Sequence, residues 1–131
     1  MRDLRKYEEL FPEEFLAIQA KTPICYWACG PMEYHGLQNT LGIDPAKAYE
    51  ICLRAASISG GIVFPLVPFA PGGRPPSLKR AELRPLNPRY APSLMTCVET
   101  CERLYVELFE SLADMGFKSC VAFGGHGPAG A

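Results

Sequence analysis

Three short, largely apolar runs divide the chain, and each is bounded by glycine, proline or polar residues. They cover residues 24–28, 62–67 and 118–123. Runs of about four to eight apolar residues between turn-forming residues are typical of strands that are buried on both faces of a sheet. The pattern therefore predicts three buried strands.

Between these runs, apolar and polar positions recur with the spacing of amphipathic helices. The predicted helices cover residues 3–19, 44–59 and 97–115. Pro12 is suited to a first helical turn, where it would restart the first helix. Asp44 directly precedes Pro45 and stands where an N-cap is expected. Thr96 and Glu99 have the spacing of a capping box at the start of the third helix.

The alternation of strands and helices is typical of parallel strands joined by helical crossovers. At 131 residues, the chain is long enough for one domain of simple architecture. We therefore expect a single α/β domain over residues 1–131, with three layers (α/β/α) and a mainly parallel sheet.

Charge and hydropathy exclude two classes of partner. The chain has 13 Lys and Arg against 14 Asp and Glu, a net charge of −1, and no basic stripe, so nucleic acid is not expected. No apolar run approaches the roughly 18 residues that cross a bilayer, so no membrane contact is expected. Residues 1–14 are charged and lack the apolar core of a signal peptide. The expected location is the cytoplasm.

Six cysteines stand at positions 25, 29, 52, 97, 101 and 120. In a cytoplasmic protein they are expected to be reduced and buried as small apolar groups. Cys97 and Cys101 are one helical turn apart, but neither a histidine nor a Cys-x-x-Cys pair accompanies them. We interpret them as helix packing, with metal or redox chemistry as the lesser alternative.

A long segment rich in proline, glycine and basic residues covers positions 68–92. Loops beyond about 12 to 15 residues are usually functional covers or disordered. The segment is interpreted as a substrate-side loop or an oligomer contact. A solvated loop whose arginines face water is an equal alternative.

The two histidines give the strongest indication of chemistry. His35 lies in residues 33–36 (EYHG), with Asp44 nine residues on, and His126 lies in residues 124–127 (GGHG). Imidazole and carboxylate groups are ligands that zinc, manganese and iron accept. Both segments follow predicted strands, and ligands bind at the carboxyl ends of parallel strands. We therefore expect the two segments to meet in one crevice and form a divalent metal site.

Each candidate ligand also has a purely structural interpretation. Glu33 and His35 are two residues apart, which in extended backbone puts both side chains on one side, yet a surface turn is also consistent with the motif. For Asp44, helix capping competes with ligation. His126 follows a strand in a glycine-rich turn, where a hydrogen-bonded structural role is as consistent as ligation.

Five features follow one another in order: residues 33–36 (EYHG), Asp44, residues 64–69 (FPLVPF), residues 112–117 (LADMGF) and residues 125–127 (GHG). In this order and spacing they resemble the creatininase family of amidohydrolases over nearly the whole chain. The resemblance implies a creatininase-like fold and metal-dependent hydrolysis of an amide-like, often cyclic C–N bond or a related carbonyl compound. A water held between two divalent ions (Zn, Mn or Fe) would attack a small-molecule substrate.

The resemblance also implies a role for each ligand. Glu33 and His126 would hold one metal ion, His35 would hold the other, and Asp44 would bridge both. Glu33, Asp44 and His126 are therefore expected to be catalytic as well as metal-binding. A carboxylate between two cations offsets their mutual repulsion, which would explain a bridging Asp44.

The chain departs from the creatininase pattern at several positions. Gln38 stands where many relatives have a second histidine, and we expect it, with Gly125 and Gly127, to contact substrate. Pro128 stands where the pattern can place a glutamate ligand. Family members continue beyond the last turn with further strands, so the fold is expected to be incomplete at its C-terminus.

Two expectations about the whole protein remain. Creatininase-like proteins are commonly hexamers, so a homo-oligomer is expected. The alternative function is a degenerate relative that binds a small molecule or a partner without catalysis, which Gln38, Pro128 and the end at Ala131 favour.

Overall fold

The computed structural model describes residues 3–71, 93–94 and 96–127. Their helices and strands follow one another as the 3₁₀-helix η1 (Tyr7–Glu9), α1 (Pro12–Lys21), β1 (Ile24–Cys29), α2 (Ile43–Ser59), β2 (Ile62–Val67), α4 (Val98–Asp114) and β3 (Ser119–Gly124). The three predicted strands are confirmed, with bounds that differ from the expected ones by at most one residue.

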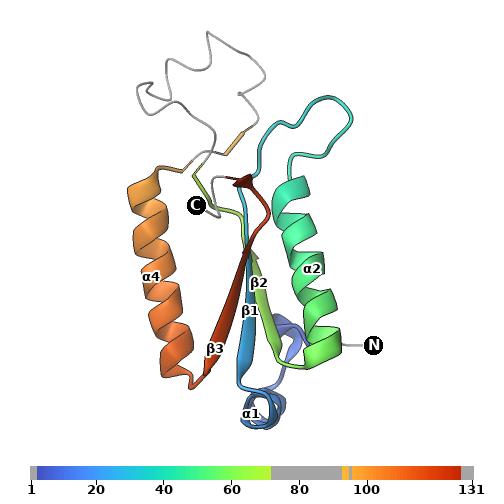
Figure 1. The fold of residues 1–131 in the computed structure, drawn as a ribbon, viewed down its shortest axis with the longest axis vertical. Helices are drawn as coiled ribbons and strands as arrows, with labels where there is room; N and C mark the ends of the chain where they lie inside the picture. Colours follow the sequence, from blue (N-terminus) through green and yellow to red (C-terminus); the bar gives the residue numbers. More distant parts are fainter. Residues whose placement is uncertain (1–2, 72–92, 95, 128–131) are drawn as a thin grey trace.

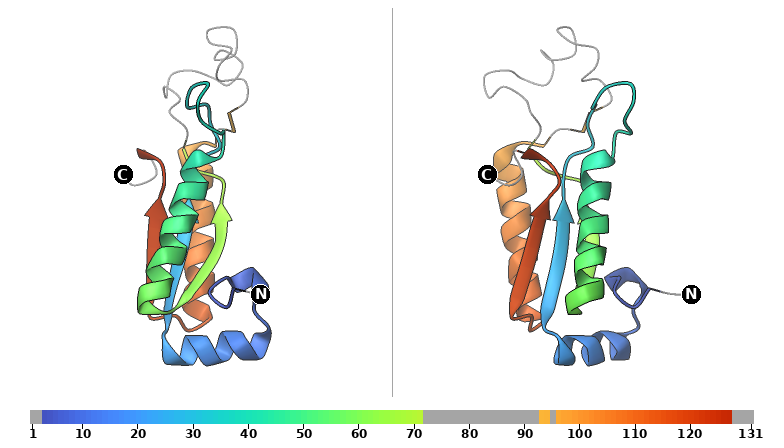
Figure 2. Two further views of the ribbon diagram at one scale, coloured as in Figure 1. Left: turned by 90° about the vertical axis from the view of Figure 1, so that its right-hand side faces the viewer. Right: turned by 45° about the vertical axis from the view of Figure 1, so that its right-hand side comes forward.

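The strands form one parallel sheet in the order β2-β1-β3. β1 lies in the centre, and its Cys25 pairs in register with Ile62 on one side and Cys120 on the other. Helix α2 covers one face of the sheet and α4 the other, as the two views of Figure 2 show. The expected three-layer α/β/α arrangement with parallel strands is therefore confirmed.

Alternate residues of β1 point to opposite faces of the sheet and so contribute to different halves of the core. Tyr26 and Ala28 pack with buried residues of α2, namely Ala48, Cys52, Leu53 and Ala56. On the other face, Cys25 packs with Leu112 of α4 and with Phe117. Trp27 lies on the same face and meets the rings of Tyr105 and Phe109 edge-on, with centroids 4.8 and 4.9 Å away. These contacts hold α4 to the sheet.

The N-terminal segment differs from the expected helix over residues 3–19. Only Tyr7–Glu9 and Pro12–Lys21 are helical, and Phe11 between them is extended (φ −80°, ψ 156°). The physical reason is Pro12, whose ring disfavours helical backbone in the preceding residue. The helix therefore begins at the proline and does not run through it. The preceding segment instead follows β2, where the Val63 N–H donates to the Arg5 carbonyl (2.7 Å).

Two predicted helix caps are wrong. Helix α2 begins at Ile43, with Gly42 as N-cap, and the Asp44 side chain makes no capping hydrogen bond. Helix α4 has Cys97 and not Thr96 at its N-cap position, again without a side-chain cap. In both cases the helix starts at a different residue from the one that local sequence favours.

The thiols fall into two groups. Cys25, Cys29, Cys52 and Cys101 are buried, as expected, whereas Cys97 and Cys120 are exposed, and all six are free. Cys97 is exposed because it precedes the first turn of α4, and Cys120 because it lies on β3 at an edge of the sheet. The expected burial is therefore wrong for these two.

Most of the predicted loop over residues 68–92 lies outside the described residues. Its described beginning and the segment that follows it lie side by side, because Pro71 forms a parallel bridge with Thr96. Among the described helices, none is long and apolar enough to cross a membrane.

Candidate metal centre

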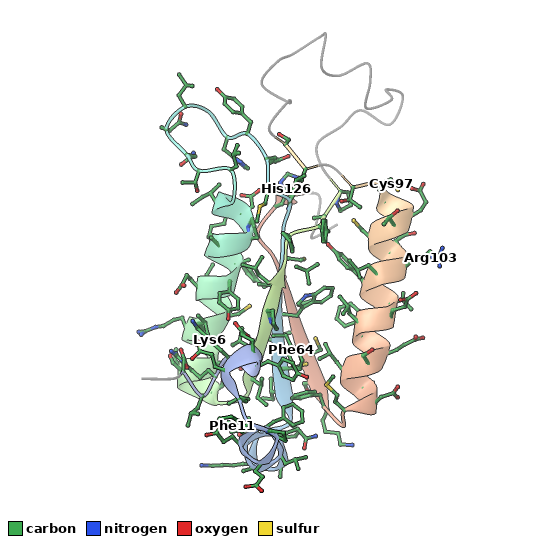
Figure 3. The ribbon with its side chains drawn as sticks, turned by 180° about the vertical axis from the view of Figure 1, so that it is seen from behind. Lys6, Phe11, Phe64, Cys97, Arg103 and His126 are labelled. Atoms are coloured by element: carbon green, nitrogen blue, oxygen red, sulfur yellow. The ribbon has the colours of Figure 1, made fainter. Side chains whose placement is uncertain are left out.

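The four predicted ligands converge where β1 and β3 end and α2 begins. Figure 1 shows that these three ends lie at the same edge of the sheet, and Figure 3 places His126 there, beside the first turn of α2. This edge is the carboxyl end of the parallel strands, where the sequence predicted the crevice.

Glu33 and His35 belong to the segment that leaves β1. Backbone hydrogen bonds fix this segment, since Glu33 N–H donates to the Leu41 carbonyl (2.8 Å) and Leu94 N–H donates to the Met32 carbonyl (2.7 Å). The Tyr34 N–H also donates to the Ser93 hydroxyl (3.0 Å). The ligand segment is therefore held both by the chain that leads into α2 and by the segment before α4.

Asp44 lies in the first turn of α2 and is only 4% exposed. The positive end of the helix dipole favours a carboxylate at this position. Gly30 lies against this turn, because a Cβ atom there would be 3.1 Å from the backbone nitrogen of Pro45. The turn can therefore pack directly on the end of β1.

Gly125 brings His126 to Asp44. Its N–H donates to the Cys29 carbonyl (2.9 Å), which continues the pairing of β1 with β3. A Cβ atom at Gly125 would overlap the carbonyl group of Asp44, so only glycine allows this approach. Gly127, in contrast, has no atom of the described residues within 4 Å of the position of a Cβ, its chain neighbours aside.

The ligand atoms of the four side chains form a compact group. His126 Nδ1 lies 3.0 Å from Asp44 Oδ2 and 3.1 Å from Glu33 Oε1. His35 Nε2 lies 3.2 Å from the same Asp44 oxygen and 3.7 Å from the same Glu33 oxygen. All four atoms lie within 4.8 Å of one another.

The chemistry of this group fits a divalent cation. His35 Nδ1 lies 3.1 Å from the Glu33 carbonyl, which can only accept, so Nδ1 carries a proton and Nε2, which faces the two carboxylates, is the nitrogen that could bind a metal. A backbone carbonyl in this position commonly orients a metal-binding histidine. Two carboxylates and two imidazoles are a donor set of the kind that zinc, manganese and iron bind.

The position of the proton on His126 also bears on which of its nitrogens could bind a metal. Ligation through Nδ1 would leave the proton on Nε2, and this atom is buried without a hydrogen-bond partner in the described part of the chain. The imidazole is therefore held by its Nδ1 side, where both carboxylates lie.

One predicted substrate residue has a contact within its own loop. The exposed Gln38 amide donates to the His35 carbonyl (3.2 Å), as does the Asn39 amide (3.2 Å). Gly36, which precedes them, has a positive φ of 90°. These residues form the turn between His35 and α2, so Gln38 orients the ligand segment in this structure.

Two residues near the centre were missed from the sequence. The Ser93 hydroxyl accepts a hydrogen bond from the Tyr34 N–H. Nothing in the sequence indicates this contact, because the two residues lie far apart in the chain. The Lys47 ammonium lies 3.7 Å from Asp44 Oδ1. Its spacing of three residues from an acidic residue on a predicted helix is a known signal for such a pair.

An apolar cavity lies elsewhere in the described part of the chain. Its volume is about 340 Å³, and it lies between β2 and α4, lined by residues that include Trp27, Phe64 and Leu108. None of the four ligands lines it, so it is not part of the metal centre.

Comparison with known proteins agrees with this architecture. A structure described as creatinine amidohydrolase (creatininase) superposes with a TM-score of 0.78 at 20% sequence identity, over 93% of this chain and 45% of that chain. The chain thus spans less than half the length of that enzyme, and the likeness concerns the fold. No curated protein matches the chain.

The sequence model of the creatininase family, described as creatinine amidohydrolase, matches residues 8–130. Because this match covers nearly the whole chain, the protein belongs to the creatininase family.

Proposed function

We propose that this protein is a metal-dependent hydrolase that cleaves an amide-like C–N bond, often in a ring, or a related carbonyl compound. The observation that carries the proposal is the convergence of Glu33, His35, Asp44 and His126 at one edge of the sheet. Membership of the creatininase family supports the same reaction class.

The proposed role of the four side chains is to hold and orient a divalent cation such as Zn²⁺, Mn²⁺ or Fe²⁺. When bound, such a cation polarises a carbonyl and lowers the pKa of water toward neutrality, and both effects favour hydrolysis at neutral pH. The carboxylates of Glu33 and Asp44 supply two negative charges that balance it. The backbone bonds of the 33–35 segment keep these groups in place before substrate arrives.

Burial indicates the side from which substrate would enter. The Asp44 side chain is 5% exposed and that of His126 is 10% exposed, whereas that of His35 is 29% exposed. A small molecule would therefore approach across His35, with the first turn of α2 behind the centre. Gln38, Gly125 and Gly127 remain proposed substrate contacts, since they flank His35 and His126 in the chain.

The proposal is tested first by metal content. Protein purified without chelator is analysed by elemental mass spectrometry, beside the double variant Glu33→Ala, His126→Ala and the control Glu102→Ala, which removes an exposed carboxylate on α4. Bound zinc, manganese or iron in wild type and control, but not in the double variant, is the expected result. Absence of metal from wild-type protein would overturn the proposal and favour the alternative, a relative that binds a small molecule without catalysis.

Hydrolysis is the second test. The metal-loaded protein is assayed for ring opening of creatinine, the substrate in the name of the similar enzyme, and of other cyclic amides. Turnover that chelator abolishes, and that the double variant lacks, is expected. More than half of the similar enzyme has no counterpart in this chain, so the assay is also run on any longer form of the protein.

Self-association is part of the same proposal. In the described residues β3 pairs only with β1, and Val121 on β3 is 45% exposed. An exposed apolar edge strand favours pairing with another chain. Light scattering coupled to size exclusion should therefore give a mass above that of a monomer, and a monomer would contradict this part.

A further inference from the structure

We infer that the centre holds one divalent cation, and that the Lys47 ammonium takes the place of a second cation beside the outer oxygen of Asp44. The inference rests on the proposed metal-dependent function and differs from the two-ion site expected from the family resemblance. Three observations carry it: the compactness of the ligand set, the partner of Asp44 Oδ1, and the lack of further ligands.

The first observation is the geometry of the four ligand atoms. The distances between them are 3.0, 3.1, 3.2 and 3.7 Å for the four imidazole–carboxylate pairs. A tetrahedral ion with bonds of about 2.0–2.1 Å requires distances of about 3.3–3.4 Å between its ligands. Both imidazoles face the same oxygen of Glu33 and the same oxygen of Asp44. The two remaining distances, between the imidazoles and between the carboxylates, lie within 4.8 Å, so the four atoms are close enough to surround one ion.

A two-ion centre would need a different division of these ligands. Its ions lie about 3.5–4 Å apart, and the bridging carboxylate serves both. His35 and His126 would then belong to different ions and would be turned toward different sites. In this structure both rings are turned toward Asp44 Oδ2, which leaves Oδ1 as the oxygen for any second ion.

The second observation is that Asp44 Oδ1 already has a cationic partner. Lys47 lies one turn further along α2, and its ammonium is 3.7 Å from Oδ1. A second divalent ion on Oδ1 would be repelled by this ammonium, and solvent reduces the repulsion because the Lys47 side chain is 51% exposed. The positive charge therefore opposes a second ion on Oδ1.

The third observation concerns the ligands that a second ion would need. Within the described residues, no further His, Cys, Asp or Glu side chain joins the group of four. In the sequence, proline occupies position 128, where the family pattern can place a glutamate ligand. Among the described residues, a second ion would therefore have only one free oxygen of Asp44.

The test is the number and affinity of bound ions. Zn²⁺ is titrated by calorimetry into protein stripped of metal, and bound zinc is counted by elemental mass spectrometry after gel filtration. Wild type is compared with Lys47→Met, which removes the charge, and Lys47→Glu, which replaces it with a carboxylate next to Oδ1. Arg54→Glu is the control, because it makes the same charge change on the same helix about 10 Å further along. Circular dichroism confirms that each variant is folded.

One equivalent of zinc is expected for wild type and for Arg54→Glu, with equal dissociation constants. Lys47→Met should also bind one equivalent, several-fold more tightly, because Asp44 then gives its full charge to the ion. Lys47→Glu should bind two equivalents, the second more weakly. Two equivalents in wild type, or an unchanged affinity and number in both Lys47 variants, would overturn this inference alone. No zinc in wild type would overturn the proposed function as well.

Discussion

Gly125 is the residue on which the assembly of the centre depends most directly. It lies between the end of β3 and the ligand His126, and its backbone contacts the carbonyl of Asp44 without room for a side chain. Its role is close approach, because its φ is not in the left-handed region. A single methyl group would therefore separate two ligands that come from distant parts of the chain.

We predict that Gly125→Ala moves His126 away from Asp44 and lowers metal affinity at least tenfold. Overpacking of this kind also costs about 1 to 3 kcal/mol of unfolding free energy. Gly127→Ala is the matched control, since no atom of the described residues apart from its chain neighbours lies within 4 Å of the place that its new methyl group would take. Calorimetric titration with Zn²⁺ and urea unfolding measure both effects. Equal metal affinity in the two variants would show that the close contact is not needed.

At the scale of elements, the segment before α1 connects the sheet with α2. The Arg5 guanidinium donates to both carboxylate oxygens of Asp3, at 2.8 and 2.6 Å, and to the Leu53 carbonyl of α2 at 3.0 Å. Its backbone carbonyl accepts from Val63 of β2. The ion pair thus orients the guanidinium that ties the N-terminus to two other elements.

This ion pair makes stability depend on pH. Hydrogen bonding from Arg5 lowers the pKa of Asp3 to about 2, from an ordinary value of 3.8. Because the folded pKa is the lower one, the stabilisation is present above about pH 4 and is lost as pH falls toward 2. Asp3→Asn should therefore cost about 0.5 kcal/mol at pH 7, a small value because solvent screens the pair.

Urea unfolding of wild type and Asp3→Asn between pH 7 and pH 3 measures this difference. The difference should shrink steadily below pH 4. Glu102→Gln, which removes the charge of an exposed carboxylate beyond the first turn of α4, is the control and should leave the unfolding free energy unchanged across the range. A difference for Asp3→Asn that does not change with pH would exclude the ion pair as its cause.

At the scale of the whole molecule, the four ligands connect three separate parts of the fold. Glu33 and His35 follow β1, Asp44 lies in the first turn of α2, and His126 follows β3. A cation bound by all four cross-links these parts in the folded state only. Metal binding at this proposed centre would therefore be coupled to folding.

We predict that metal at about a hundred times its dissociation constant raises the unfolding free energy by about 2.7 kcal/mol, provided that it binds only the folded state. Differential scanning fluorimetry with and without EDTA measures the corresponding rise in Tm. The Glu33→Ala, His126→Ala double variant should show no rise, while Glu102→Ala should behave as wild type. A rise of equal size in the double variant would place the stabilising ion elsewhere.

Much of the fold could be predicted because its signals are local. An apolar run between glycines and prolines gives β2 with its bounds, and helical periodicity gives α2 and α4. The restart at Pro12 agrees with the start of α1, but the helix expected before it is interrupted because Pro12 also acts on the preceding residue. The role of Asp44 was ambiguous because capping and ligation favour the same residue type at the same place.

The order of strands and helices and the four residues with metal-binding chemistry could be predicted from the sequence, since periodicity and residue type are properties of the chain. How those residues meet depends on packing between elements that are far apart in the chain. The parallel pairing of β1 with β3 and the contact of Gly125 with Asp44 bring together groups 82 residues apart. The tertiary structure also decides which oxygen of Asp44 faces the imidazoles and which faces Lys47, because side-chain direction depends on packing between elements that local sequence does not specify.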